Sequence, residues 1–94
     1  MNDGRLIRVP IPELSEERRK DMVKIASRTT EDQRVTVRNI RRDANDQIKN
    51  LEKQNELTED DRKQSLDEIQ KITNEIISKM DNLLTSKEKE IMEV

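Results

Sequence analysis

From residue 15 onward, apolar and polar residues alternate with the spacing of a helix. In the first half, apolar and semi-apolar positions recur at steps of four, three and four residues, repeated every eleven: Met22, Ala26, Thr29, Gln33, Val37, Ile40, Ala44, Ile48 and Leu51. An eleven-residue repeat keeps one face of a nearly straight helix apolar. The pattern therefore predicts a helix over about 15–54, with Ser15 as its N-cap.

A second helix is predicted over about 59–92. Thr58 precedes three acidic residues, as in a capping box. One apolar row follows a spacing of three and four: Leu66, Ile69, Thr73, Ile76, Met80, Leu83 and Lys87. A second row, Ile77, Leu84 and Ile91, runs beside it, and Ile72 lies on the other flank. Because one neighbouring helix covers only the first row, we expect the second to face another partner.

The two helices are expected to form an antiparallel hairpin, because only about five residues join them. The fold class is therefore all-α. If about ten aliphatic side chains each lost half of a burial free energy of ~1.5–3 kcal/mol, the deficit would be on the order of 10 kcal/mol. That is as large as the whole stability of a typical domain, so another helix should cover the open groove.

Residues 1–14 differ from the rest of the chain. They contain strand-forming residues, but Pro10 and Pro12 cannot donate ladder hydrogen bonds. We interpret this segment as an extended arm, with a disordered leader as the alternative. The predicted organisation is thus an arm over 1–14 and a helical hairpin over 15–94.

Composition excludes most chemistry. Among its 94 residues the chain has no Cys, His, Phe, Tyr or Trp. Thiolate or imidazole metal sites and nucleophile–histidine pairs are therefore absent, and so are the aromatic platforms that stack on unpaired bases. We expect no enzyme, no cofactor, no metal and no small-molecule substrate. No apolar run is long enough for a signal peptide or a membrane span, so the cytoplasm is the expected compartment.

Charge is distributed unevenly along the chain. The net charge is −2, but segments 1–14, 15–55 and 56–94 carry 0, +3 and −5. On a helix, Arg34, Arg38, Arg41 and Arg42 fall along the flank of the first apolar stripe, which is suited to binding phosphate. The alternative for any of them is a solvated side chain or a carboxylate partner, such as Asp46 for Arg42.

Two other groups have structural interpretations. An acidic cluster surrounds the start of the second helix, but it lacks the spacing of a calcium loop and fits the helix dipole: Glu59, Asp60, Asp61, Asp67 and Glu68. Met22, Met80 and Met92 are interpreted as residues that fill gaps in a core.

Four sequence runs together resemble the bacterial ribosome recycling factor family. They are Ile7-Arg-Val-Pro-Ile-Pro-Glu-Leu14, Ser15-Glu-Glu-Arg-Arg-Lys20, Val35-Thr-Val-Arg-Asn-Ile-Arg-Arg-Asp-Ala-Asn45 and Lys87-Glu-Lys-Glu-Ile-Met-Glu-Val94. The resemblance implies a long three-helix bundle with a β-rich domain inserted between its first two helices. It also implies a non-catalytic factor that splits post-termination ribosomes with elongation factor G. This chain then corresponds to the second and third helices, preceded by the arm.

The resemblance also implies which arginines face large-subunit ribosomal RNA. These are Arg19, Arg38 and Arg41, and Arg34 and Arg42 lie beside them. Without a first helix, we expect the hairpin to self-associate as a homodimer that makes a four-helix bundle. Two functions remain: a translation factor that binds ribosomal RNA through a basic flank, or a helical scaffold that only pairs with other proteins. Exposed arginines in the assembled oligomer would favour the first.

Overall fold

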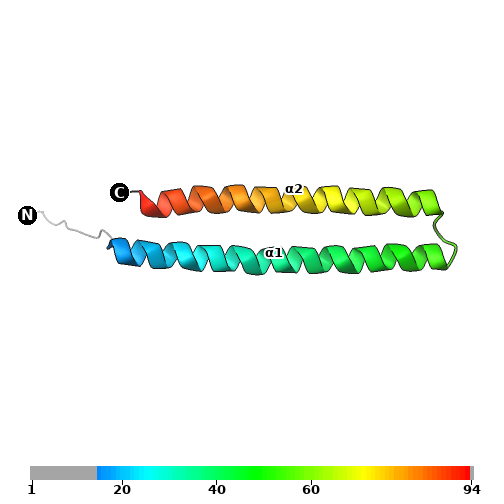
Figure 1. Cartoon of the computed structure of the whole chain (residues 1–94), viewed down its shortest axis with the longest axis horizontal. Helices are drawn as coiled ribbons and strands as arrows, with labels where there is room; N and C mark the ends of the chain where they lie inside the picture. The colour runs from blue at the N-terminus through cyan, green and yellow to red at the C-terminus, as the bar shows by residue number, and fades with distance from the viewer. Residues whose placement is uncertain (1–14, 94) are drawn as a thin grey trace, which may run out of the picture.

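The computed structural model describes residues 15–93, which form two long antiparallel helices. Helix α1 spans Glu16–Lys53 and α2 spans Glu59–Met92 (Figure 1). The predicted bounds, about 15–54 and about 59–92, differ from these by one residue at each end of α1 and by none in α2. The predicted all-α helical hairpin is confirmed for the described residues. The arm over 1–14 and residue 94 lie outside them.

The helices start at the residues that the cap signals predicted. Ser15 accepts a hydrogen bond from the backbone N–H of Arg18 (3.1 Å). Thr58 accepts from the backbone N–H of Asp61 (3.0 Å), and the Asp61 carboxylate accepts from the backbone N–H of Thr58. This reciprocal pair is the predicted capping box, and it satisfies two backbone donors that would otherwise be unpaired.

The turn between the helices is closed by the backbone. Asn55 adopts φ 62°, in the left-handed region, and it allows Glu56 N–H to reach Leu51 C=O and Asn55 N–H to reach Glu52 C=O (both 2.9 Å). These two bonds satisfy the last carbonyls of α1, as in a Schellman motif, with asparagine taking the place usually held by glycine. Arg62 Nε then pairs with Glu52 Oε1 across the end of the hairpin (3.2 Å).

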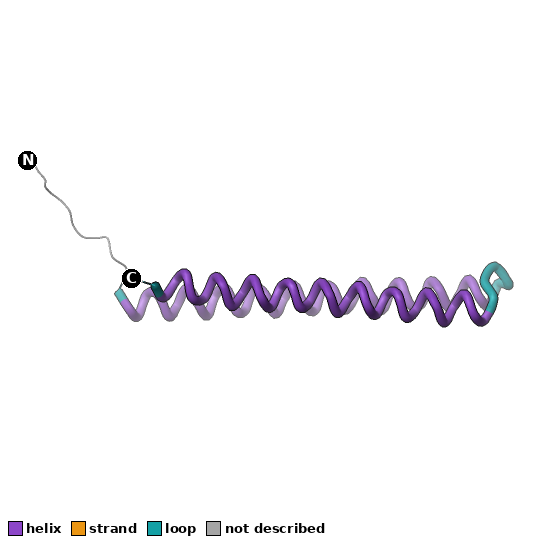
Figure 2. Tube along the Cα trace, turned by 90° about the horizontal axis from the view of Figure 1, so that it is seen from above, coloured by secondary structure: helices purple, strands orange, loops and turns teal. Residues whose placement is uncertain are grey.

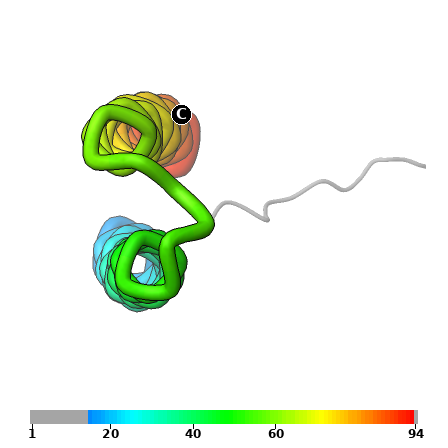
Figure 3. Tube along the Cα trace, turned by 90° about the vertical axis from the view of Figure 1, so that its right-hand side faces the viewer, coloured from blue at the N-terminus to red at the C-terminus, as the bar shows by residue number. Residues whose placement is uncertain are grey.

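The hairpin has almost no interior. Figure 1 shows the helices side by side along their length, Figure 2, turned by 90°, shows one in front of the other, and the end-on view of Figure 3 shows two separate rods. No apolar residue among 15–93 is fully buried, and only Thr73 is, with 5% of its surface exposed. Its hydroxyl donates to Ile69 C=O (2.7 Å), so the polar group at the contact line is satisfied within its own helix.

The apolar stripe predicted for the first helix only partly follows the line along which α1 touches α2. Five of its residues are half-buried, namely Ala26, Val37, Ala44, Ile48 and Leu51. Met22, Thr29, Gln33 and Ile40 are exposed, and Ile40 keeps 63% of its surface in water. Neighbours of the predicted stripe are half-buried as well, namely Val23, Thr30, Arg34 and Arg41. The predicted stripe is centred on a direction to one side of α2, where a further helix would lie, because its spacing suits a bundle of more than two helices.

The assignment of the two rows on α2 was right only in part. In the row assigned to the neighbouring helix, Leu66, Ile69, Thr73 and Met80 are buried or half-buried, but Ile76 and Leu83 are 41% and 61% exposed. The row assigned to a further partner, Ile77, Leu84 and Ile91, is half-buried, while Ile72 on the other flank is 54% exposed. Spacing alone does not fix how a helix is rotated towards its single neighbour. Met22 and Met92 are each 37% exposed, so these two do not fill a core, while Met80 is half-buried.

Removing the Thr58 cap should destabilise the folded chain measurably. We expect Thr58→Ala to lower the free energy of unfolding by ~1 kcal/mol, because the N–H of Asp61 loses its acceptor. Urea unfolding followed by circular dichroism, at one protein concentration for all variants, measures this change.

Thr85→Ala is the matched control, because the exposed Thr85 hydroxyl bonds only to Asp81 C=O within the helix (3.0 Å). Its free energy of unfolding should stay within about 0.5 kcal/mol of the unmodified chain. Equal losses for the two variants would contradict the role given to the cap.

Candidate nucleic-acid interface

Four arginines lie on one flank of α1, which we call the basic flank: Arg34, Arg38, Arg41 and Arg42. Because α1 is a continuous helix here, they fall within about 100° around its axis and within about 12 Å along it. The sequence therefore predicted correctly that these residues are close together. Their side chains, however, have different surroundings.

Arg34 is held by two carboxylates. Its Nε and Nη2 donate to Asp81 Oδ1 of α2 (2.8 and 2.5 Å), and its Nη1 donates to Glu31 Oε1 (2.8 Å). The hydrogen bond to Asp81, followed by that to Glu31, raises the pKa of Arg34 above its ordinary value. A raised pKa means that folding favours the charged form of Arg34. The contribution of these hydrogen bonds to the stability of the fold is therefore fully present at all pH values below the ordinary pKa of arginine. Arg34 thus joins the helices and is already neutralised.

Arg38 and Arg41 have no such partners. Both are half-exposed, and neither forms an ion pair or side-chain hydrogen bond with residues 15–93. Arg42 is exposed and donates only to the neutral side chain of Asn39 (3.0 Å), so the suggested pairing with Asp46 is absent within the described residues. These three guanidinium groups retain their full charge for an external anion.

Arg19 lies apart from the basic flank, about 22 Å before Arg34 along the axis of α1. Its Nη1 donates to the backbone carbonyls of Ile91 (3.3 Å) and Glu93 at the end of α2. A cation is favoured there because the last carbonyls of a helix are unpaired and carry partial negative charge. In this structure Arg19 therefore ties the first turn of α1 to the end of α2.

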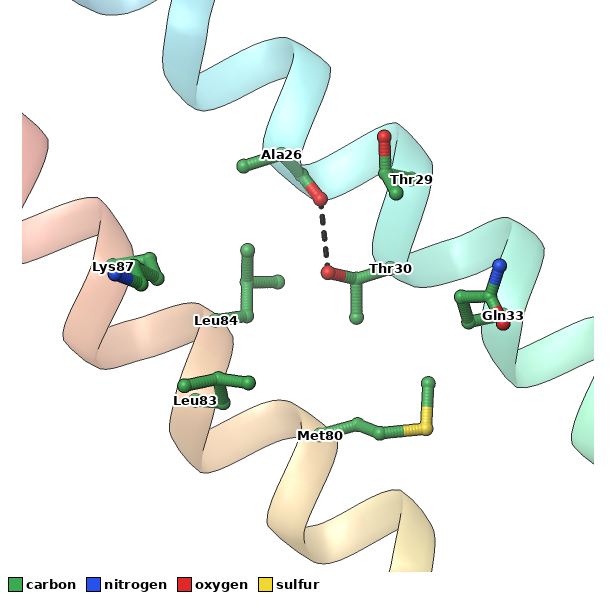
Figure 4. A pocket seen from close by; sticks show the side chains of 8 residues that line it. All are labelled: Ala26, Thr29, Thr30, Gln33, Met80, Leu83, Leu84 and Lys87. Carbon is green, nitrogen blue, oxygen red and sulfur yellow. Dashed lines mark hydrogen bonds between the residues drawn. The ribbon is translucent and has the colours of Figure 1, made fainter.

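The other side of the hairpin is apolar and hollowed, and we call it the trough. It contains one hollow of about 340 Å³ and another of about 210 Å³. The larger is lined by Ala26, Thr29, Thr30, Gln33, Met80, Leu83, Leu84 and Lys87, and the smaller by Val37, Ile40, Arg41, Ala44, Ile69, Ile72, Thr73 and Ile76. Figure 4 shows Leu84 directed at α1 between Ala26 and Thr30, with Met80 extending towards Gln33.

The basic flank and the trough lie on different sides of the hairpin. At 100° per residue, the positions of Arg34, Arg38 and Arg42 lie on one side of the line that joins the two helix axes, and Ile40 lies on the other side. Arg41 lies close to the joining line, which explains why it also borders the smaller hollow. A partner in the trough therefore leaves the outer part of the basic flank accessible.

Sequence reasoning missed Asp81, the residue that holds Arg34. Asp81 and Arg34 are 47 positions apart, and only the register of the two helices brings them together. The sequence offered one indication, because Asp81 is an acidic residue among the apolar residues Met80, Leu83 and Leu84 and had been given no role. Across the described residues, no group of side chains suits a metal ion, and neither helix is long and apolar enough to cross a membrane.

Comparison with known proteins gives one consistent family. Residues 1–92 match the family described as ribosome recycling factor. Ribosome-recycling factors of Oleidesulfovibrio alaskensis and Bacillus subtilis are 56% and 52% identical to the chain over 94 and 93 residues. The matches cover 100% and 99% of this chain but only 51% and 50% of those proteins. The chain therefore spans about half the length of the curated relatives it matches.

These matches bear on both the resemblance and the expected chemistry. The resemblance carried by the four sequence runs is confirmed, because the matched residues include all of the first three runs and most of the fourth. Ribosome recycling factors are translation factors and not enzymes, in agreement with the prediction that the chain is not an enzyme. The chain belongs to the ribosome recycling factor family.

Proposed function

We propose that this chain binds the phosphate backbone of large-subunit ribosomal RNA through Arg38, Arg41 and Arg42. In the whole protein this binding would contribute to splitting post-termination ribosomes together with elongation factor G, in the cytoplasm. The chain itself acts as a binding element and supplies no catalytic group.

One observation carries this proposal. Arg38 and Arg41 are cations on a continuous helix that no described carboxylate neutralises, although 21 of the 94 residues of the chain are acidic. A row of unpaired guanidinium groups suits phosphates, because each guanidinium can donate two parallel N–H bonds to the oxygens of one phosphate. Because the chain has no aromatic ring, contacts to the backbone of a folded RNA are favoured over stacking on its bases.

Arg34 and Arg19 have a different part in the proposal. Both are engaged within the hairpin, Arg34 with Asp81 and Arg19 with the end of α2. Arg34 fixes the register of the helices and so determines how the basic flank is presented. Either residue would have to exchange its present partners in order to bind RNA, so we expect smaller direct contributions from them.

A scaffold function is the second candidate, and the trough favours it. Large apolar side chains there stay in water, which marks a surface for another protein. Self-association of this chain as a homodimer, which would complete a four-helix bundle, uses the trough and leaves Arg38 and Arg42 outside. The two functions are therefore compatible, and RNA binding decides whether the chain is more than a scaffold.

Arg38 should contribute one phosphate contact. With purified bacterial large ribosomal subunits, we expect Arg38→Ala to weaken binding and to reduce the slope of log affinity against log salt by roughly one. Arg41→Ala should behave in the same way. Fluorescence anisotropy of the labelled chain over a salt titration gives both slopes.

Arg18→Ala is the matched control, because Arg18 is an exposed arginine of α1 outside the basic flank. Its slope should equal that of the unmodified chain. If neither Arg38→Ala nor Arg41→Ala changes the slope, or if Arg18→Ala changes it equally, the proposed RNA contact is wrong and the scaffold function remains.

Arg34 should behave as a structural residue. We expect Arg34→Ala to change the salt slope by less than about half of a unit, because its charge is already paired with Asp81. The same variant should lower the melting temperature, since Asp81 loses its interhelical donor. If Arg34→Ala instead reduced the salt slope by about one and left the melting temperature unchanged, Arg34 would be an RNA contact.

A further inference from the structure

Val35 is an exposed apolar residue that the trough does not explain. Its side chain is β-branched and apolar, yet it keeps 46% of its surface in water. Ile40 and Leu83 are more exposed, but both line the hollows of the trough, whereas Val35 lines neither hollow. At 100° per residue, Val35 lies on the same side of the line that joins the helix axes as Arg38 and Arg42. Its exposure therefore belongs to the side of the basic flank.

Val35 is one of four residues spaced by seven along α1, which we call the outer row: Arg28, Val35, Arg42 and Lys49. Seven residues make nearly two helical turns. Each member therefore lies about 10.5 Å further along α1 and only about 20° further around it than the one before. All four side chains are exposed on a helix that is continuous over Glu16–Lys53. The outer row thus places one apolar side chain between cations, at even spacing, over about 32 Å.

The cations of the outer row have no carboxylate partner within the part of the chain that the structure describes. Arg28 and Lys49 form neither an ion pair nor a side-chain hydrogen bond there. Asp32 and Asp46 lie four residues after Arg28 and Arg42, but a cation that precedes its acid by four residues is the less favourable order on a helix. The charges of the row are therefore available to an external anion.

The outer row also points away from the acidic part of the chain. Residues 56–94 carry a net charge of −5. Members of the row lie about 100–160° around α1 from the line that joins the helix axes, so they are turned away from α2. Asp81, which reaches the basic flank from α2, is already bonded to Arg34. An anion on the outer row therefore meets the cations of α1 while α2 and its carboxylates lie behind them.

We propose that a strand of ribosomal RNA lies lengthwise along the outer row, with phosphates at Arg28, Arg42 and Lys49 and a ribose against Val35. This inference rests on the RNA binding proposed above and specifies further contact residues and the direction of the strand. A nucleic-acid strand alternates charged phosphates with sugars whose carbon atoms offer apolar surface. An apolar side chain between cations matches that alternation, and contacts of both kinds position a protein on RNA.

Val35 suits a contact with a sugar for two reasons. A valine side chain is nearly fixed in one rotamer on a helix, so little conformational entropy is lost when a ribose covers it. Its side chain is also neutral, so covering it releases no counterions. The contribution of Val35 to affinity should therefore be independent of salt, unlike that of the cations in the row.

A salt titration with large ribosomal subunits separates the two kinds of contact. Arg28→Ala and Lys49→Ala should each reduce the slope of log affinity against log salt by roughly one. Val35→Ala should weaken binding about threefold to tenfold at every salt concentration and leave the slope unchanged, because it removes apolar contact area but no charge.

Thr36→Ala is the matched control for Val35→Ala. Thr36 is also exposed and β-branched, and its hydroxyl bonds only to Asp32 C=O within the helix (3.1 Å). Because it lies about 100° further around α1, off the outer row, its substitution should change the affinity by less than about twofold. Arg18→Ala again serves as the control for the charged residues.

Two results of the titration would overturn the lengthwise strand. One is an equal loss of affinity for Val35→Ala and Thr36→Ala, and the other is an unchanged slope for both Arg28→Ala and Lys49→Ala. If Arg38→Ala still reduced the slope in either case, RNA binding through the basic flank would stand without the outer row. If Arg38→Ala and Arg41→Ala also left the slope unchanged, both proposals would be wrong.

Photocrosslinking identifies the molecule that covers Val35. A benzophenone amino acid at position 35 reacts with C–H bonds of whatever lies against it, and ribose carbons carry such bonds. After irradiation with large subunits, the labelled chain should run as an adduct that ribonuclease shortens, and the same amino acid at position 36 should give little of it. An adduct with a ribosomal protein at position 35, or no adduct there, would overturn the proposal.

Discussion

Two helices can bury only the narrow strip along which they touch, and every other feature of this chain follows from that limit. Each helix has several rows of apolar residues, but a single neighbour covers one of them. Among the described residues only Thr73 is fully removed from water, and Ile40 and Leu83 remain mostly exposed. The hairpin is therefore held along one line, and its stability depends on what covers the rest.

Polar groups along the strip help to define how the helices meet. Arg34 and Asp81 join the middle of the hairpin, Arg62 and Glu52 join it near the loop, and Arg19 reaches the end of α2. Exposed ion pairs contribute little to stability, but their spacing along the hairpin specifies one register. That register determines which arginines are already paired and which are left for a phosphate.

The sequence predicted the elements well because their signals are local. Ser15, Thr58 and the acids after Thr58 mark helix starts by direct contacts with the nearest backbone groups. The rotation of each helix was predicted less well, because apolar spacing points to the average direction of all neighbours. Ile40 was assigned to the apolar face of the first helix and is turned towards the trough, while Leu84 was assigned to a row for a further partner and faces α1. The positions of the arginines followed from helical geometry, but the role of Arg34 required knowing that Asp81 lies opposite.

The central claim is that the hairpin is not a complete folding unit until its trough is covered, and the dependence of unfolding on concentration tests it most directly. If a second copy provides the cover, mass action requires the midpoint of thermal unfolding to rise with protein concentration. We predict that the midpoint, measured by circular dichroism, rises steadily over a hundredfold range of protein concentration around the micromolar level. A midpoint that stays constant while the chain remains fully helical at the lowest concentration would contradict the account.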